Sequence, residues 1–241
     1  MPLLADPTCI ADPTCIADPT WLADLTWVEA AEQHGRVLVV PLGSTEQHGP
    51  HLPVSTDTDI ATALAARVAA GRPDVVVAPS VPYGASGEHA GFAGTLSIGQ
   101  AALELLVVEL VRSATASFAR VLLVSGHGGN AEPLQRAVTL LRGEGRDVRA
   151  WAPRWRGDAH AGRTETSVQL ALGPQRVRPV RAAGATASLA ELLPELRRTG
   201  VRGVSANGVL GDPAGAGAAE GEQLLAAAAD DLAAVLDEWP A

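Results

Sequence analysis

The chain has 241 residues, 47% of them hydrophobic and 19% charged, which fits a single globular domain. Its 27 acidic and 18 basic residues give a formal net charge of −9, which disfavours a surface that follows the phosphates of DNA or RNA. The chain contains no lysine, so Schiff-base, P-loop and serine–lysine chemistries are excluded. No apolar run reaches the length of a membrane span, and the N-terminus does not resemble a signal peptide. We therefore expect a cytoplasmic protein that binds neither nucleic acid nor membrane.

The N-terminus consists of a repeated hexad, ADPTCI, with a proline in each copy. Proline lacks an amide hydrogen and restricts the residue before it, so the repeat cannot continue as a helix. We expect residues 1–20 to form a flexible extension and residues 21–241 to form the folded domain. The only two cysteines, Cys9 and Cys15, lie in the repeat, which leaves the domain without a disulfide framework or a cysteine-rich zinc site.

From Trp21 onward, short β-branched runs alternate with longer helical patterns. Buried strands are predicted at residues 36–41, 74–79, 120–125 and 147–151. Helices are predicted at residues 57–70, 99–119, 130–143, 188–198 and 220–238. The alternation predicts an α/β fold, a single domain whose mainly parallel sheet is flanked by helices on both faces. A (β/α)8 barrel also fits the length, but only four strands are evident, so it ranks second.

Each predicted strand is followed by a loop rich in glycine and in ionisable residues. In an open parallel sheet such loops meet at the carboxyl edge, where binding sites form. Five of the six histidines lie in these loops, together with several carboxylates. The ionisable residues of interest are Glu46, His48, His51, Asp57, Glu88, His89, His127, His160 and Glu165.

A repeated tetrapeptide shows why position matters. Residues 32–35 spell Glu-Gln-His-Gly, and residues 46–49 spell it again, but the first copy precedes the first strand and the second follows it. The first copy should therefore lie at the opposite edge of the sheet, at the end of a surface helix. The second copy should belong to the site.

This set of polar residues favours a metal centre. Carboxylates and imidazoles without an available thiol are suitable ligands for Zn²⁺, Mn²⁺ or Fe²⁺. An aspartate that bridges two ions would produce a binuclear site suited to hydrolysis. Asp57 could instead cap the helix that follows it, and Asp59 is a second choice of ligand. Residues 126–129 could instead form an anion-binding nest, and covalent catalysis by a serine after one of the strands is a further alternative.

Four ordered segments resemble the successive motifs of the creatininase, or creatinine amidohydrolase, family. They are residues 43–57, 84–99, 125–130 and 158–167. The resemblance covers about residues 22–240. It implies a creatininase-like α/β/α fold, a metal-dependent amidohydrolase with two divalent metal ions per chain (zinc, iron or manganese), and a homo-oligomer.

The resemblance also implies which residues bind the ions. Glu46, Asp57 and His127 would hold one ion, whereas His48 and Asp57 would hold the other together with an acidic residue. In creatininase that acidic residue lies two positions after the histidine matched by His127, and this chain has Gly129 there.

We predict that Glu165 supplies the missing carboxylate and serves in catalysis. His160 matches a family histidine implicated in catalysis and is the predicted general acid/base. The residues predicted to contact substrate are His51, Glu88, His89, Trp155 and Arg156.

Within the family, residues 83–89, 157–167 and 208–213 are most similar to the branch that acts in mycofactocin maturation. That similarity implies hydrolysis of the modified precursor peptide near its C-terminus, which releases the crosslinked Val-Tyr-derived product. One alternative is a creatininase-like cyclic amide hydrolase or a deformylase that acts on another small amide. An alternative of another class is a non-catalytic metal-binding scaffold.

Overall fold

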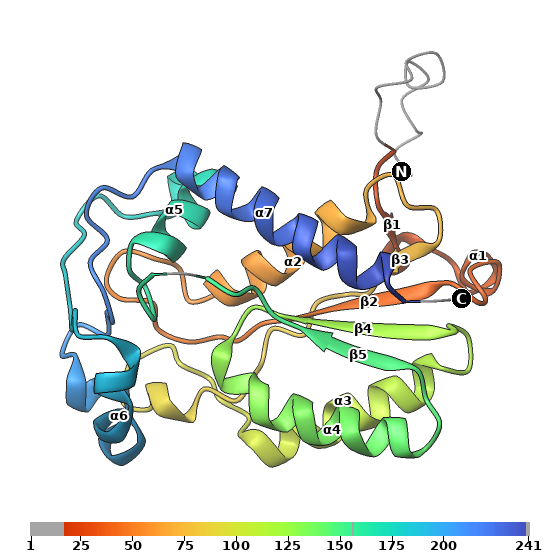
Figure 1. The fold of residues 1–241 in the computed structure, drawn as a ribbon, viewed down its shortest axis with the longest axis horizontal. Coiled ribbons are helices and arrows are strands. Elements are labelled where there is room, and N and C mark those ends of the chain that lie inside the picture. The colour runs from red at the N-terminus through yellow and green to blue at the C-terminus, as the bar shows by residue number, and fades with distance from the viewer. Residues whose placement is uncertain (1–16, 156, 240–241) are drawn as a thin grey trace.

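The computed structural model describes residues 17–155 and 157–239, which form one parallel five-stranded sheet in the order β1-β3-β2-β4-β5 (Figure 1). The strands are β1 (Thr20–Trp21), β2 (Val37–Leu42), β3 (Val75–Val77), β4 (Arg120–Ser125) and β5 (Val148–Trp151). The predicted α/β fold is therefore confirmed, and all four predicted strands are present. The barrel alternative is wrong, because β1 and β5 are the two edges of this open sheet.

β1 is the strand that the sequence pattern does not predict. Thr20 pairs with Val76 and Trp21 pairs with Val77 at the edge of the sheet. Two residues are too few to show a strand periodicity. Residues 1–16, which make up most of the predicted N-terminal extension, lie outside the described residues.

Helices cover both faces of the sheet (Figure 1). On one face lie α2 (Thr56–Ala69), α5 (Arg163–Leu172) and α7 (Ala218–Asp237), and on the other lie α3 (Gln100–Ala114) and α4 (Ala131–Gly143). Side chains of a strand alternate between the two faces. Thus Val37 and Val39 of β2 pack in the core beneath α2 and α7. Leu38 and Val40 pack against α3 and α4.

Two further helices lie at opposite ends of the sheet. α1 (Trp27–Ala31) precedes β2, whereas α6 (Leu189–Val204) lies on the side of the carboxyl ends of the strands (Figure 1). α6 extends beyond its predicted end because it continues after a kink at Gly200, whose φ is 69°. None of the helices in the described part of the chain is long and apolar enough to cross a membrane.

Short 3-10 turns complete the structure. They are Leu22–Asp24, Gly87–His89, Gly128–Asn130 and Pro174–Arg176. α1 is the surface helix expected before residues 32–35, whereas α5 was not predicted as a helix, and α3 ends at Ala114 where the pattern suggested residue 119. α5 begins directly after a glycine and contains few apolar residues, so the sequence shows only a weak helical periodicity there.

The two Glu-Gln-His-Gly copies lie at opposite ends of β2, as predicted. His34 of the first copy is exposed and follows α1. Glu46 and His48 of the second copy follow the carboxyl end of β2 and are fully buried. The same tetrapeptide therefore serves as a surface turn at one end and as part of the site at the other.

Candidate metal centre

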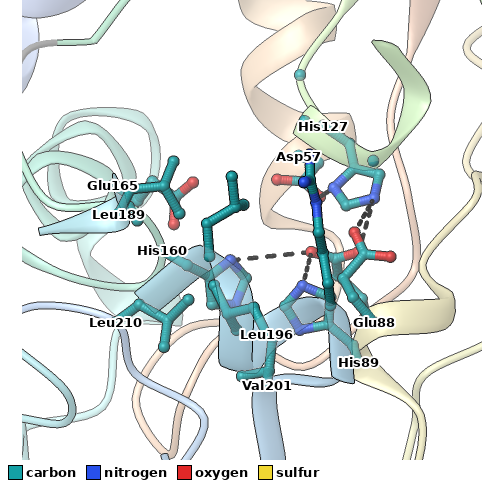
Figure 2. Close-up of a pocket in the computed structure, with 17 residues that line it drawn as sticks. Asp57, Glu88, His89, His127, His160, Glu165, Leu189, Leu196, Val201 and Leu210 are labelled. Atoms are coloured by element: carbon teal, nitrogen blue, oxygen red, sulfur yellow. Dashed lines mark ion pairs between the residues drawn. The ribbon is translucent and has the colours of Figure 1, made fainter. Parts of the chain in front are cut away.

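The loops after β2, β3, β4 and β5 meet at the carboxyl edge of the sheet and line a cavity of about 410 Å³ (Figure 2). Its ionisable lining residues are Glu46, Asp57, Glu88, His89, His127, His160, Glu165 and Arg197. The structure therefore brings together most of the site residues predicted from the sequence.

Asn130 ties two of these loops together. Its amide nitrogen donates to the carbonyl of Gly43 at 3.0 Å, and its amide oxygen accepts from the backbone N–H of Ala85 at 3.0 Å. A Cβ atom at Gly126 would lie 2.1 Å from the carbonyl oxygen of Asp57. Only glycine therefore allows the loop after β4 to approach the start of α2.

Glu46, Asp57 and His127 form the first group of potential ligands. Oε2 of Glu46 lies 3.3 Å from Nε2 of His127, and Oδ2 of Asp57 lies 3.4 Å from Nδ1 of the same ring. Glu46 is fully buried, and neither of its carboxylate oxygens has a hydrogen-bond partner. Burial, followed by the negative charge of Asp57, raises the pKa of Glu46 to about 7. A buried carboxylate without a hydrogen-bond partner is costly, so this group fits a divalent cation.

His48, His160 and Glu165 form a second group of potential ligands. Nε2 of His48 lies 3.1 Å from Oδ1 of Asp57 and 3.8 Å from Oε2 of Glu165. Asp57 thus presents one oxygen to His48 and the other to His127. This is the arrangement that a bridging carboxylate requires.

Asp57 does not cap α2, although its place in the sequence allowed that role. It is the second residue of the helix, whose N-cap is Ser55. The hydroxyl of Ser44 donates to Oδ2 of Asp57 at 2.5 Å, which holds the carboxylate toward the site. Asp59, the second choice of ligand, pairs with Arg176 at 2.8 Å and does not line the cavity.

The buried histidines fall into two electrostatic classes. Burial lowers the pKa of His48, but the adjacent Asp57 outweighs burial and raises it to about 10. Burial likewise lowers the pKa of His127, yet Glu46 and Glu88 raise it to about 9. The pKa of His160 lies well below its usual value because of burial, followed by the charge of His48. In the ion-free protein, His48 and His127 therefore carry the protons that balance the buried carboxylates, and a bound cation must displace them.

A strained turn places His160 and Glu165 on the same side of the site. Ala161 has a φ of 53°, which is rare for a residue with a Cβ atom. Its backbone N–H donates to Oε2 of Glu165 at 2.6 Å. The carboxylate of Asp158 accepts from the backbone N–H of Arg163 at 2.5 Å. This bond supplies a partner for one of the N–H groups that the first turn of α5 leaves without an intrahelical acceptor. Glu165 lies in that first turn.

Glu88 occupies the space beside Gly129. A Cβ atom at Gly129 would lie 2.4 Å from Oε1 of Glu88 and 2.4 Å from Nε2 of His127. Oε1 of Glu88 lies 3.4 Å from Nε2 of His127. A larger residue at position 129 would therefore displace both side chains.

Two predicted substrate contacts lie elsewhere, and one cannot be placed. His51 is fully buried outside the cavity, where its Nε2 lies 2.9 Å from Oγ1 of Thr166. Trp155 packs against the core beneath α7. Arg156 lies outside the described residues. Glu88 and His89, by contrast, line the cavity.

α6 adds an apolar wall that the sequence analysis did not assign to the site. This wall, called here the α6 wall, consists of Leu189, Leu193, Leu196 and Val201 of α6, together with Leu210 (Figure 2). The strong amphipathic pattern of α6 was the available signal, but such a pattern usually indicates a core-facing helix. Here the apolar face lies against a cavity.

Comparisons with known proteins agree with this geometry. The sequence profile of the family described as creatinine amidohydrolase matches residues 23–236. The chain is 54% identical over 211 residues to the mycofactocin precursor peptide peptidase of Mycolicibacterium smegmatis, with 84% of this chain and 85% of that protein covered. It is 34% identical over 110 residues to the creatinine amidohydrolase of Pseudomonas putida, with 43% of this chain and 42% of that protein covered.

The fold has counterparts among solved structures. A crystal structure of creatininase superimposes with a TM-score of 0.75 at 27% identity, covering 92% of this chain and 99% of that one. Two further creatininase structures with a TM-score of 0.75 are described as a Zn-Zn type and as a Mn form.

The chain therefore belongs to the creatininase family. It is a hydrolase that acts on carbon–nitrogen bonds. This excludes the non-catalytic scaffold as its main role.

Proposed function

We propose that the protein is a metal-dependent peptidase that cleaves a modified precursor peptide of the mycofactocin type near its C-terminus. The observation that carries the metal dependence is the fully buried carboxylate of Glu46, which has no hydrogen-bond partner and lies beside Asp57 and His127. Relatives named mycofactocin precursor peptide peptidase, at 52% to 54% identity, support the substrate class.

Glu46, Asp57 and His127 are the proposed ligands of one ion, and His48, Asp57 and Glu165 are those of a second. Oxygen and imidazole donors of this kind suit Zn²⁺, Fe²⁺ or Mn²⁺. When bound, such ions lower the pKa of water toward neutrality and polarise the carbonyl group of an amide.

His160 is the proposed general acid/base. Its Nε2 donates to the backbone carbonyl of Gln47 at 2.8 Å, which leaves Nδ1 without a proton. The low pKa of His160 keeps the ring neutral at pH 7, so Nδ1 can accept a proton and later return it to the leaving amine. Glu165 was predicted both as a ligand and as a catalytic residue. Because the N–H of Ala161 already holds its Oε2, we propose the ligand role.

The α6 wall favours a peptide over a small polar ring. Leu189 and Leu193 are 50% and 37% exposed in the chain, and both line the cavity. An apolar side chain next to the scissile bond would bury this surface, whereas a small polar ring would leave it in water.

Mass spectrometry of the modified precursor peptide after incubation with the protein tests the proposal. We expect two products whose masses sum to that of the substrate plus one water, loss of cleavage with chelator, and recovery with added divalent ions. Full activity of chelated protein would contradict metal dependence. Turnover of creatinine or a formylated amide without peptide cleavage would favour the small-amide alternative. Light scattering would test the predicted homo-oligomer.

A further inference from the structure

We propose that Gln47 is a positioning residue that holds the imidazole proton of both His89 and His160 on Nε2. In consequence, His89 presents an N–H group to the cavity and does not bind a metal ion, whereas His160 presents an unprotonated Nδ1. Neither the family resemblance nor the ligand groups assign a role to Gln47, which lies between Glu46 and His48.

Two backbone groups fix the orientation of the Gln47 amide. The N–H of Gly49 donates to Oε1 at 2.9 Å, and the carbonyl of Gly208 accepts from Nε2 at 3.0 Å. A backbone N–H can only donate and a carbonyl can only accept, so the amide oxygen and nitrogen cannot exchange places. Gly208 has a φ of 79°, and a Cβ atom there would lie 1.9 Å from Oε1 of Gln47. The glycine of the 208–213 motif therefore admits this side chain.

The two protons of the amide nitrogen have three neighbours. Besides Gly208, Nε2 of Gln47 lies 2.9 Å from Nδ1 of His89 and 3.1 Å from Nε2 of His160. Nε2 of His160 already lies 2.8 Å from the backbone carbonyl of Gln47, and that bond requires a proton on the ring nitrogen. His160 therefore cannot accept from the amide, and the second amide proton goes to Nδ1 of His89.

Because Nδ1 of His89 accepts this proton, the single proton of the neutral imidazole ring must lie on Nε2. A doubly protonated ring would carry a proton on Nδ1 and could not accept from the amide, so the contact with Gln47 also requires the neutral ring. Its Nε2 lies 3.2 Å from Oε1 of Glu46, and the residue lines the cavity (Figure 2). His89 therefore faces the site with an N–H group.

This assignment removes one potential metal group. Glu46, His89 and His160 lie close enough together to hold an ion by distance alone. A ligating nitrogen must be unprotonated, however, and Gln47 keeps the proton on the nitrogen of His89 that faces Glu46. The site is then limited to the two ion sites proposed above, which share Asp57, and the unprotonated Nδ1 of His160 remains available.

A long-range ¹H–¹⁵N correlation spectrum of the zinc-loaded, ¹⁵N-labelled protein tests the assignment directly. We expect a neutral His89 that is protonated at Nε2, with its signals identified by their loss in a His89→Gln variant. A proton on Nδ1 of His89 in the wild-type protein would overturn the proposal, and this result does not depend on the proposed function or on any Gln47 variant.

Gln47→Glu tests the role in catalysis, which rests on the proposed function. The carboxylate can only accept, so the His89 proton should move to Nδ1. We expect kcat to fall about 10- to 100-fold, the usual effect of losing a group that orients an active-site residue, with KM changed less than about threefold. The matched control is Gln33→Glu, in the first copy of the tetrapeptide, which should leave kcat and the His89 signals unchanged. An unchanged His89 tautomer in Gln47→Glu, or an equal fall in kcat in the control, would contradict the proposal.

Discussion

Oε2 of Glu165 lies 3.8 Å from Nε2 of His48 in the folded chain. His48 belongs to the loop after β2, whereas Glu165 belongs to the first turn of α5. A carboxylate therefore stands beside His48 even though Gly129 replaces the acidic residue expected after His127. This contact supports the proposed second ion site.

Glu46→Gln should separate the role of Glu46 in metal binding from its effect on stability. We expect the variant to lose its bound metal. Its kcat should fall more than about 100-fold, which exceeds the usual effect of substituting a residue that only supports a metal ligand. In chelator at pH 8 its Tm should exceed that of the wild-type protein, because burial disfavours the charge on Glu46, whose pKa it raises to about 7, and the amide carries no charge. Metal analysis and thermal unfolding measure both effects.

The control for that variant is Glu32→Gln, at the same position of the first tetrapeptide, where the glutamate is exposed. It should retain metal, kcat and Tm. Full metal content in Glu46→Gln would contradict the proposed ligand role.

The stability of the ion-free protein should depend on pH through His48 and His127. Their folded-state pKa values of about 10 and about 9 lie above the ordinary 6.5. Their contribution to stability is therefore complete below pH 6.5 and is lost as the pH rises through 9 and 10. We expect the Tm of chelated protein to fall over this range, and that of metal-loaded protein to fall less, because bound cations replace the protons.

The same two histidines should release protons when metal binds. Titration calorimetry at pH 7 in buffers of different ionisation enthalpy should show this release, and the apparent affinity should increase from pH 6 to pH 9. An affinity independent of pH would argue against His48 and His127 as ligands.

Two neighbouring glycines offer a test of packing in the site. Gly129→Ala places a Cβ atom 2.4 Å from Glu88, His127 and the carbonyl of Ala85, so these groups must move. We expect lower metal content and a kcat reduced about tenfold or more. Gly128→Ala is the control, since nothing lies within 4 Å of its added Cβ atom. Equal behaviour of the two variants would show that the close packing at Gly129 has no functional role.

Leu196→Ala tests the α6 wall. Loss of apolar contact should lower kcat/KM about 10-fold for peptides with a bulky apolar residue beside the scissile bond. A peptide with alanine at that position should be nearly unaffected, and metal content should not change. Leu140→Ala, at an exposed leucine of α4, is the control. An equal loss for both peptides would show that the wall does not select the side chain.

Local sequence patterns determined the fold class and the place of the site. The β-branched runs of β2, β3 and β4 are buried on both faces, and local sequence patterns suffice to predict such strands. Parallel strands carry their following loops to one edge, so the meeting of Glu46, Asp57, His127 and His160 could be expected.

Only the tertiary structure decided which of the polar loop residues face the cavity. His51 and His89 look equivalent in the sequence, yet His51 packs against Thr166 while His89 lines the cavity. Likewise, the contacts of Gln47 with Gly208 and His160 join residues far apart in the chain. Side-chain direction and proton placement depend on such long-range packing and hydrogen bonds, which local periodicity does not encode.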